Sequence, residues 1–175
     1  MTVSKAAIIA RLQREILPLQ GIKITLNNTA LDKTIGSLKN VFPGNTFPVG
    51  AIHEFIAAGM EDAATTSGFI AGILTTLMQN GGAVIWIGSA HTIFPPALKL
   101  FGIVPDKIIF INLQKEKEML WAMEEALKCE GLAAVIAEIK DLSFTASRRL
   151  QLAVEQSRVT GFIIRNNPQT ITTTA

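Results

Sequence analysis

Short apolar runs alternate with longer amphipathic segments from residue 50 to residue 166, and this alternation limits what the chain can fold into. Each run is nearly continuously apolar, which is typical of a strand buried on both faces of a parallel sheet. The runs that predict strands are 51–57, 83–88, 107–112, 132–139 and 161–166, and the segments that predict helices are 67–79, 94–102, 116–129 and 145–157. We therefore expect an α/β fold with a mainly parallel sheet, five buried strands and helices on both faces.

The residues before this pattern are organised differently. Residues 4–17 carry apolar side chains near helical spacing and predict an amphipathic helix that ends before Pro18. The following stretch, to about residue 50, is rich in Asn, Gly and Pro and predicts a linker. Because 175 residues suffice for one substantial core, we expect an N-terminal helix and linker over residues 1–40 and one α/β domain over residues 41–175.

Composition narrows the location and the partners of the chain. No apolar run approaches the ~18 residues of a membrane span, and the single cysteine, Cys129, cannot form an internal disulfide, so we expect a cytoplasmic protein. The formal net charge of +2 is unevenly distributed: residues 1–40 and 140–175 are basic, and residues 41–139 are acidic. That asymmetry indicates contact with nucleic acid or an acidic partner, or else ordinary surface variation. The polar end, TITTTA, predicts an edge strand or a tail and would also suit a piece of a longer protein.

The stretch after the first predicted strand, AAGMEDAATTSGF, is where a phosphate-binding loop would lie. A P-loop requires the pattern G-x-x-x-x-G-K-[ST], in which glycines wrap the phosphates and the lysine neutralises them. The residues expected to form a vestigial nucleotide loop are Gly59, Glu61, Asp62, Ala64, Thr65 and Thr66. Ala64 and Thr65 stand where the second glycine and the lysine belong, and the two carboxylates would repel phosphate. We therefore expect no cofactor and no appreciable ATP binding, while Gly59 also fits an ordinary turn.

Other catalytic arrangements find little support in the sequence. His53 and Glu54 are neighbours in a predicted strand and point to opposite faces, and His91 stands alone, so we expect no metal site. Ser89 and His91 resemble part of a hydrolase dyad, but neither a nucleophile elbow nor an acid partner accompanies them. The sequence therefore favours a protein that binds over one that catalyses a reaction.

Two adjacent arginines, Arg148 and Arg149, stand near the start of the last predicted helix, where positive charge works against the helix dipole. One interpretation is a solvated face or an ion pair with Asp141, and the other is a binding site for an acidic partner. We expect partner binding to depend on this pair. Trp86, in a strand, and Trp121, in a helix with apolar neighbours, are both expected in the core.

Three longer motifs carry a resemblance to a known family. They read FPGNTFPVGAIHEF over residues 42–55, LWAMEEAL over residues 120–127 and FTASRRLQLA over residues 144–153. In these motifs and in their order the chain resembles the ImuA family, over roughly residues 40–166. The resemblance implies a RecA-like core of the P-loop NTPase type with a degenerate P-loop. SulA-type division inhibitors share a looser form of this fold and a similar final strand, but the TASRRLQLA helix favours ImuA.

The resemblance also assigns roles to single positions. It implies that Ala90 replaces the glutamate that activates water in RecA, that Glu138 stands for the Walker B aspartate, and that Asn166 stands for the polar sensor. Glu138 could still bind magnesium, but no general base remains. Only a short segment separates Glu138 from the last strand, which leaves little room for a DNA-binding loop of the RecA kind.

The function that the resemblance implies is a non-catalytic accessory role in bacterial SOS mutagenesis and translesion DNA synthesis. The implied partners are RecA, a Y-family-like polymerase protein and an error-prone C-family polymerase, and direct contact with DNA is left open. Two alternatives remain at this point: a SulA-like cell-division inhibitor, and a weak ATPase that a neighbouring subunit completes.

Overall fold

The structure is a computed structural model that describes residues 5, 8, 9, 12, 29–89 and 95–166. The contacts within the chain divide it into two compact units, Met1–Pro48 and Val49–Ala175. The amphipathic helix predicted over residues 4–17 lies mostly outside the described residues, and so does the polar end of the chain.

The first unit contains short helical turns where the sequence predicts a linker. Helix α2 spans Thr29–Ile35, and 3-10 turns follow at Gly36–Val41 and Pro43–Asn45. The segment predicted as a linker therefore contains local helical structure. Leu31 and Ile35 are buried and lie four residues apart on one face of a helix too short to produce a sustained period in the sequence.

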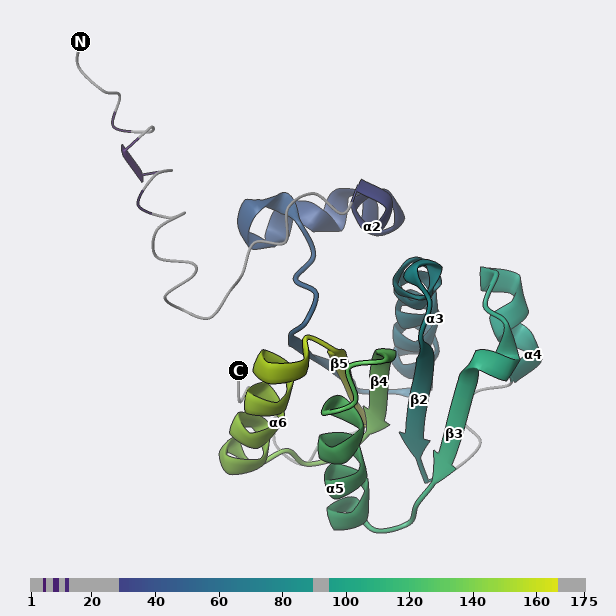
Figure 1. Ribbon diagram of the computed structural model, residues 1–175. Coiled ribbons are helices and arrows are strands. Elements are labelled where there is room, and N and C mark those ends of the chain that lie inside the picture. Colours follow the sequence, from purple (N-terminus) through teal and green to yellow (C-terminus); the bar gives the residue numbers. More distant parts are fainter. Residues whose placement is uncertain (1–4, 6–7, 10–11, 13–28, 90–94, 167–175) are drawn as a thin grey trace. The chain divides into compact units, whose positions relative to one another are not determined.

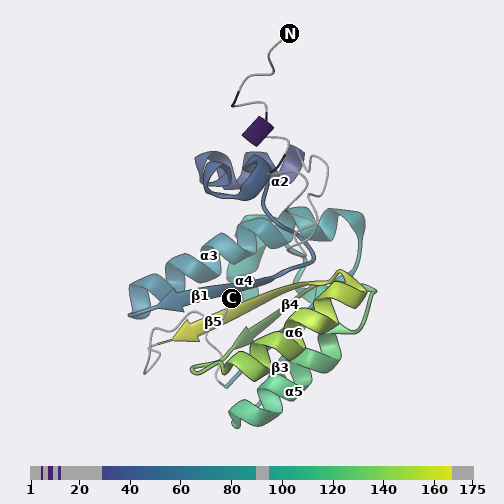
Figure 2. The same ribbon diagram turned by 90° about the vertical axis from the view of Figure 1, so that its left-hand side faces the viewer.

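The second unit is built on a sheet of five parallel strands in the order β1-β5-β4-β2-β3 (Figures 1 and 2). The strands are β1 (Ile52–Ala57), β2 (Ala83–Gly88), β3 (Ile108–Asn112), β4 (Leu132–Glu138) and β5 (Thr160–Asn166). Each predicted strand is present, and no two consecutive strands pair as a hairpin. The prediction of a parallel α/β sheet is confirmed.

Helices cover both faces of this sheet. They are α3 (Met60–Leu77), α4 (Pro95–Leu98), α5 (Glu116–Leu127) and α6 (Phe144–Ser157), with 3-10 turns at Met78–Asn80, Lys99–Phe101 and Pro105–Lys107. The chain crosses the sheet in one direction from β1 to β3 and then returns, so right-handed crossovers place α3 and α4 on one face and α5 and α6 on the other. Figure 2 shows these two helical layers with the sheet between them.

The core beneath α5 and α6 is formed by apolar side chains that alternate along the strands. The buried members of this cluster include Ile87, Val135, Ala137 and Ile163 from the strands, Met119, Met123 and Leu127 from α5, and Leu150 and Val154 from α6. On the other face Ile70, Ile73 and Leu74 of α3 are fully buried. The continuous apolar runs of the inner strands are therefore explained by burial on both faces.

Strands β1 and β3, which form the two edges of the sheet, depart from the prediction that all five strands are buried. In β1 only Ala57 is buried, and the other residues are half-buried. Ile109 is 51% exposed and Phe110 is 42% exposed, because β3 forms one edge of the sheet and pairs only with β2. Helix α4, which follows β2, has only one turn. A run that is apolar on both faces looks the same in the sequence whether it becomes a central strand or an edge strand.

The two tryptophans also differ from each other. Trp86 is 3% exposed, as predicted, but Trp121 is 63% exposed, and its prediction as a core residue is wrong. Met119, Met123 and Leu127 form the buried face of α5, and the side chain of Trp121 leaves the helix about 200° around from that of Met119.

Candidate functional site

A pocket lies at the carboxyl ends of the strands, at the point where the direction of chain crossing reverses. Strands β2 and β4 are neighbours, but β2 continues toward α4 on one face and β4 toward α6 on the other. Open α/β sheets bind ligands at such switch points. The pocket there has a volume of about 440 Å³ and is lined by Ser89, Gln114, Glu116, Met119, Glu138, Ile139, Lys140 and Asn166. We call it the switch-point pocket.

Glu138, which the resemblance aligns with the Walker B aspartate, is held by the neighbouring strand. The indole Nε1 of Trp86 donates a hydrogen bond of 2.9 Å to Oε1 of Glu138. Gly88 leaves room for the carboxylate, since a Cβ atom at this position would lie 3.2 Å from Cδ of Glu138. The indole therefore occupies one carboxylate oxygen that a metal ion would otherwise contact.

Of the other two positions that the resemblance aligns with RecA, the structure describes Asn166 but not Ala90. Asn166 ends β5 and lines the switch-point pocket, and its Oδ1 atom is buried without a hydrogen bond from the described part of the chain. Ala90 lies outside the described residues, as does His91, which with Ser89 resembles part of a hydrolase dyad in the sequence. The amide of Gln114 donates to the backbone oxygen of Ser89 at 2.9 Å and thereby joins the ends of two strand loops.

The segment expected to form a vestigial nucleotide loop is helical. Helix α3 begins at Met60, directly after Gly59, and the backbone N–H of Ala63 donates to the Gly59 carbonyl at 3.0 Å. Gly59 is the N-cap, with φ −150° and ψ −179°, an extended conformation open to any residue. The helix begins seven residues before the predicted start at residue 67, because the P-loop template treats these residues as a loop.

The remaining residues of the expected loop lie in the first two turns of α3. Asp62 Oδ2 accepts a hydrogen bond of 3.1 Å from the backbone N–H of Ala58, and Glu61 also lies in the first turn. Thr65 donates its hydroxyl to the carbonyl of Glu61 at 2.9 Å. Carboxylates in the first turn of a helix stabilise its positive end. The chain thus places its own negative charge where a phosphate would bind.

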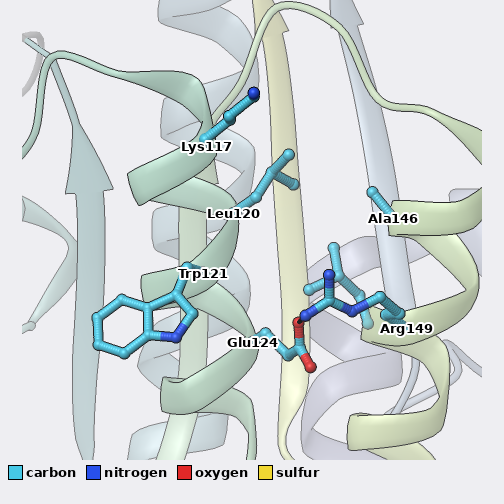
Figure 3. Close-up of a pocket in the computed structure, with 7 residues that line it drawn as sticks. Lys117, Leu120, Trp121, Glu124, Ala146 and Arg149 are labelled. Atoms are coloured by element: carbon cyan, nitrogen blue, oxygen red, sulfur yellow. Dashed lines mark ion pairs between the residues drawn. The ribbon is translucent and has the colours of Figure 1, made fainter.

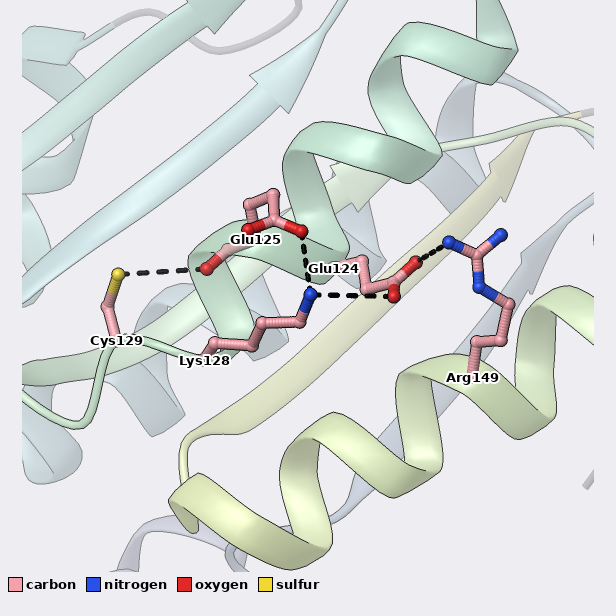
Figure 4. Close-up of polar contacts among 5 residues, drawn as sticks. All are labelled: Glu124, Glu125, Lys128, Cys129 and Arg149. Atoms are coloured by element: carbon pink, nitrogen blue, oxygen red, sulfur yellow. Dashed lines mark hydrogen bonds and ion pairs between the residues drawn. The ribbon is translucent and has the colours of Figure 1, made fainter.

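The paired arginines lie on α6 and make separate contacts. Arg149 forms an ion pair with Glu124 of α5 and so joins the two helices (Figure 4). Within the described part of the chain, Arg148 contacts residues of its own helix, with Nη1 3.6 Å from Glu155 Oε1 and 3.4 Å from Gln151 Oε1. The argument from the helix dipole does not hold, because α6 begins at Phe144 and the arginines fall in its second turn.

Asp141, the alternative partner considered for these arginines, contacts a different residue. Arg165 Nη2 lies 3.7 Å from Asp141 Oδ1, Arg165 Nη1 lies 2.6 Å from Glu54 Oε1, and Arg165 Nε donates to the Lys140 carbonyl at 3.0 Å. Arg165 is 1% exposed. It ties β5 to β1 and to the loop after β4. Its only signal in the sequence is a lone arginine in the apolar run GFIIRN.

A second pocket, on the outer face of α5 and α6, was not predicted from the sequence. We call it the α5–α6 pocket; its volume is about 270 Å³ and its lining residues are Lys117, Leu120, Trp121, Glu124, Ala146, Arg149 and Leu150 (Figure 3). Figure 3 shows the Glu124–Arg149 pair between the helices and the indole of Trp121 on the side of α5 that is away from α6. The sequence did not predict this pocket because Trp121, one of the lining residues, was assigned to the core.

Glu124 contacts a second cation besides Arg149. Lys128 Nζ lies 3.6 Å from Glu124 Oε1 and 2.6 Å from Glu125 Oε1 (Figure 4). The hydrogen bond to Glu125 and the nearby negative charges raise the pKa of Lys128, so the amine keeps its positive charge. Cys129, at the end of the same helix, is exposed and directs Sγ to the Glu125 carbonyl at 3.6 Å.

Across the described residues, no group of three or more His, Cys, Asp or Glu side chains converges as metal ligands would. None of the described helices is both long enough and apolar enough to cross a membrane.

Comparison with known proteins relates the chain to two groups. No family model matches it. Protein ImuA from two strains of Caulobacter vibrioides is 35% identical over 135 residues, which cover 75% of this chain and 55% of the relative. The chain thus spans about half the length of the curated relatives it matches.

Two solved structures share the fold. SulA from Pseudomonas aeruginosa matches with a TM-score of 0.55 and 20% identity, over 66% of this chain and 97% of its own. The RadB recombinase matches with a TM-score of 0.51 and 15% identity, over 78% of this chain and 67% of its own. At these identities the likeness shows a RecA-like α/β fold and nothing finer. The sequence match shows that this chain belongs to the ImuA family, and the structural likeness shows that its core has a RecA-like fold.

Proposed function

We propose that the chain is a non-catalytic accessory protein of DNA-damage-induced mutagenesis, which acts in translesion synthesis through protein contacts. The relation to ImuA supports the SOS setting. The expected partners are RecA, a Y-family-like polymerase protein and an error-prone C-family polymerase. The observation that carries the non-catalytic part is the start of α3 at Met60, which leaves no loop to wrap a phosphate.

Three features oppose nucleotide binding. Thr65 replaces the phosphate-binding lysine, and its hydroxyl donates a hydrogen bond to a carbonyl of the helix backbone. Glu61 and Asp62 would each repel a phosphate charge by ~1 kcal/mol even in water at about 4 Å. The Trp86 indole engages the Glu138 carboxylate. We therefore expect Mg-ATP to bind with a dissociation constant weaker than ~10 µM, which corresponds to less than roughly 7 kcal/mol of binding free energy.

Calorimetry with Mg-ATP and a phosphate-release assay test this expectation. The matched variant is Thr65→Lys, which restores the lysine without restoring the loop. We expect neither the parent nor this variant to bind, because α3 still begins at Met60. Tight binding by the parent, or ATP hydrolysis that appears when RecA is added, would overturn the non-catalytic proposal and favour an ATPase completed by a neighbouring subunit.

The accessory role itself needs a test in cells and a test with purified partners. Deleting the gene is expected to lower the frequency of damage-induced mutations, and the parent chain is expected to restore it. Purified RecA and the Y-family-like protein are then captured on the parent, on Arg148→Ala and on Arg149→Ala. We expect weaker capture by the arginine variants than by Glu61→Ala/Asp62→Ala. The reverse order would move the binding surface to the start of α3.

A SulA-like role is the second candidate, and one observation favours it. The match to SulA covers 97% of the SulA chain, so the shared core leaves little of SulA without a counterpart here. Such a role predicts that overproduction makes cells filamentous and that the purified chain binds the tubulin-like division protein. If division proceeds normally and no such binding is seen, the mutagenesis role remains.

A further inference from the structure

We propose that the α5–α6 pocket binds an acidic segment of a partner protein that also presents an apolar side chain. This inference rests on the proposed function for the existence of a partner, and it names the surface and the chemistry that the partner must have. The residues that line the α5–α6 pocket belong to α5 and α6, and these helices lie on the opposite side of the sheet from α3 (Figure 2), so the pocket is separate from the start of α3.

Apolar contact is the first requirement, and it comes from Trp121 and from the interior of the pocket. Trp121 is 63% exposed, which is unusual for a side chain of this size. Leu120, Ala146 and Leu150 provide apolar lining to the hollow next to it. Protein interfaces concentrate their binding energy in tryptophan and arginine residues beside such hollows. An apolar side chain of the partner would fill the pocket and pack against the indole.

Charge sets the second requirement. Lys117 is exposed at the pocket and forms no ion pair within the described part of the chain. Arg149 is 61% exposed although it is paired. Glu124 is the only acidic residue that lines the pocket, and it is already in contact with two cations. The lining of the pocket is therefore positive on balance, which suits a partner that carries carboxylates. The carboxylates of Glu118 and Glu125, elsewhere on α5, are paired with Lys115 and Lys128.

The third step is an exchange of ion pairs that the geometry allows. A partner carboxylate can take Arg149 away from Glu124 without leaving Glu124 isolated, because Lys128 Nζ already lies 3.6 Å from Glu124 Oε1. The guanidinium of arginine suits such a carboxylate because its planar fork can form two hydrogen bonds with it. Glu124 thus competes with the partner for Arg149, and its removal should strengthen binding.

The experiment titrates the full chain with a labelled synthetic peptide that alternates Leu and Phe with Asp and Glu, followed by fluorescence anisotropy. Control peptides carry Lys in place of the acidic residues, or Ala in place of the apolar ones. We expect saturable binding of the first peptide, at least about tenfold weaker binding of each control, and a similar loss in Trp121→Ala. Lys117→Glu should also weaken binding, and more so at low salt.

Two variants separate this proposal from a general stickiness of the surface. Glu124→Gln should bind the acidic peptide severalfold more tightly, a gain that a purely structural role of Glu124 does not produce. Phe144→Ala removes another aromatic side chain, 72% exposed and outside the pocket lining, and should leave binding unchanged. No saturable binding, equal binding of the Lys peptide, or equal losses in Phe144→Ala and Trp121→Ala would overturn the proposal.

A cell assay distinguishes failure of this inference from failure of the proposed function. If the parent chain restores damage-induced mutagenesis and Trp121→Ala restores it equally, the pocket is not the docking site and the accessory role stands. If deleting the gene leaves mutagenesis unchanged, the accessory role fails, whatever the peptide result.

Discussion

Replacing Glu54 by Gln should destabilise the domain by about 3 kcal/mol, because it removes the negative charge that lies 2.6 Å from the buried guanidinium of Arg165. Glu54 is 10% exposed and Arg165 is 1% exposed, and their side chains are 2.6 Å apart. Breaking a pair buried to this degree typically costs ~3–5 kcal/mol. Asp141 remains 3.7 Å from Arg165 and is 47% exposed, so it offsets part of the loss and favours the lower figure.

The assay is urea denaturation followed by circular dichroism, on the parent, Glu54→Gln, Arg165→Met and the double variant. A loss of ~3 kcal/mol is a large part of the ~5–15 kcal/mol that stabilises a typical domain. The double variant should cost less than the sum of the single changes by ~1–2 kcal/mol, because the two residues interact directly. Asp141→Asn is the control and should cost less than ~1 kcal/mol, as for an exposed pair. The reasoning is refuted if Glu54→Gln costs no more than Asp141→Asn.

The remaining predictions concern packing, one hydrogen bond and one ion pair. Ile136→Ala should cost ~2–5 kcal/mol in urea denaturation because Ile136 is fully buried, whereas Ile109→Ala, on the open edge of β3, should cost clearly less; equal losses would contradict the assigned burial. Trp86→Phe removes the indole donor to Glu138 and should cost ~1–3 kcal/mol in the same assay, while an unchanged midpoint would mean that the bond contributes nothing. Arg149→Ala should lower the free energy of unfolding by less than ~1 kcal/mol, and so lower the thermal midpoint only slightly, because the arginine of this ion pair is 61% exposed. A loss of several kcal/mol would make Arg149 a structural residue instead.

The sequence pattern was sufficient to locate the strands and the class of fold. A continuous apolar run needs no knowledge of its neighbours, and each of the five runs became a strand in a parallel sheet. It was not sufficient to show which strand lies at an edge, because the position of β3 depends on the order of strands. The early start of α3 was missed since Gly59 offers no side-chain cap and the segment resembles a loop motif.

The candidate site was harder to predict than the fold, for two reasons. Contacts such as Arg165 with Glu54 join residues that are 111 positions apart, and nothing in either local segment names the other. Whether Trp121 is exposed depends on which face of α5 it occupies. The sequence pattern predicts a core position because an aromatic residue among apolar neighbours usually points inward. The alignment with RecA positions did reach Glu138 and Asn166, and both line the switch-point pocket.

The strand order also has a consequence for how the domain forms. Among the described strands, β1 leaves the ribosome first, yet it pairs with β5, which leaves last. Until β5 has been synthesised, β1 has no backbone partner, and the Glu54–Arg165 pair cannot close. Contacts between segments so distant in the chain carry a large entropic cost and slow folding. Between the synthesis of β1 and that of β5, the nascent chain therefore exposes an unpaired strand, and unpaired strands are prone to aggregation.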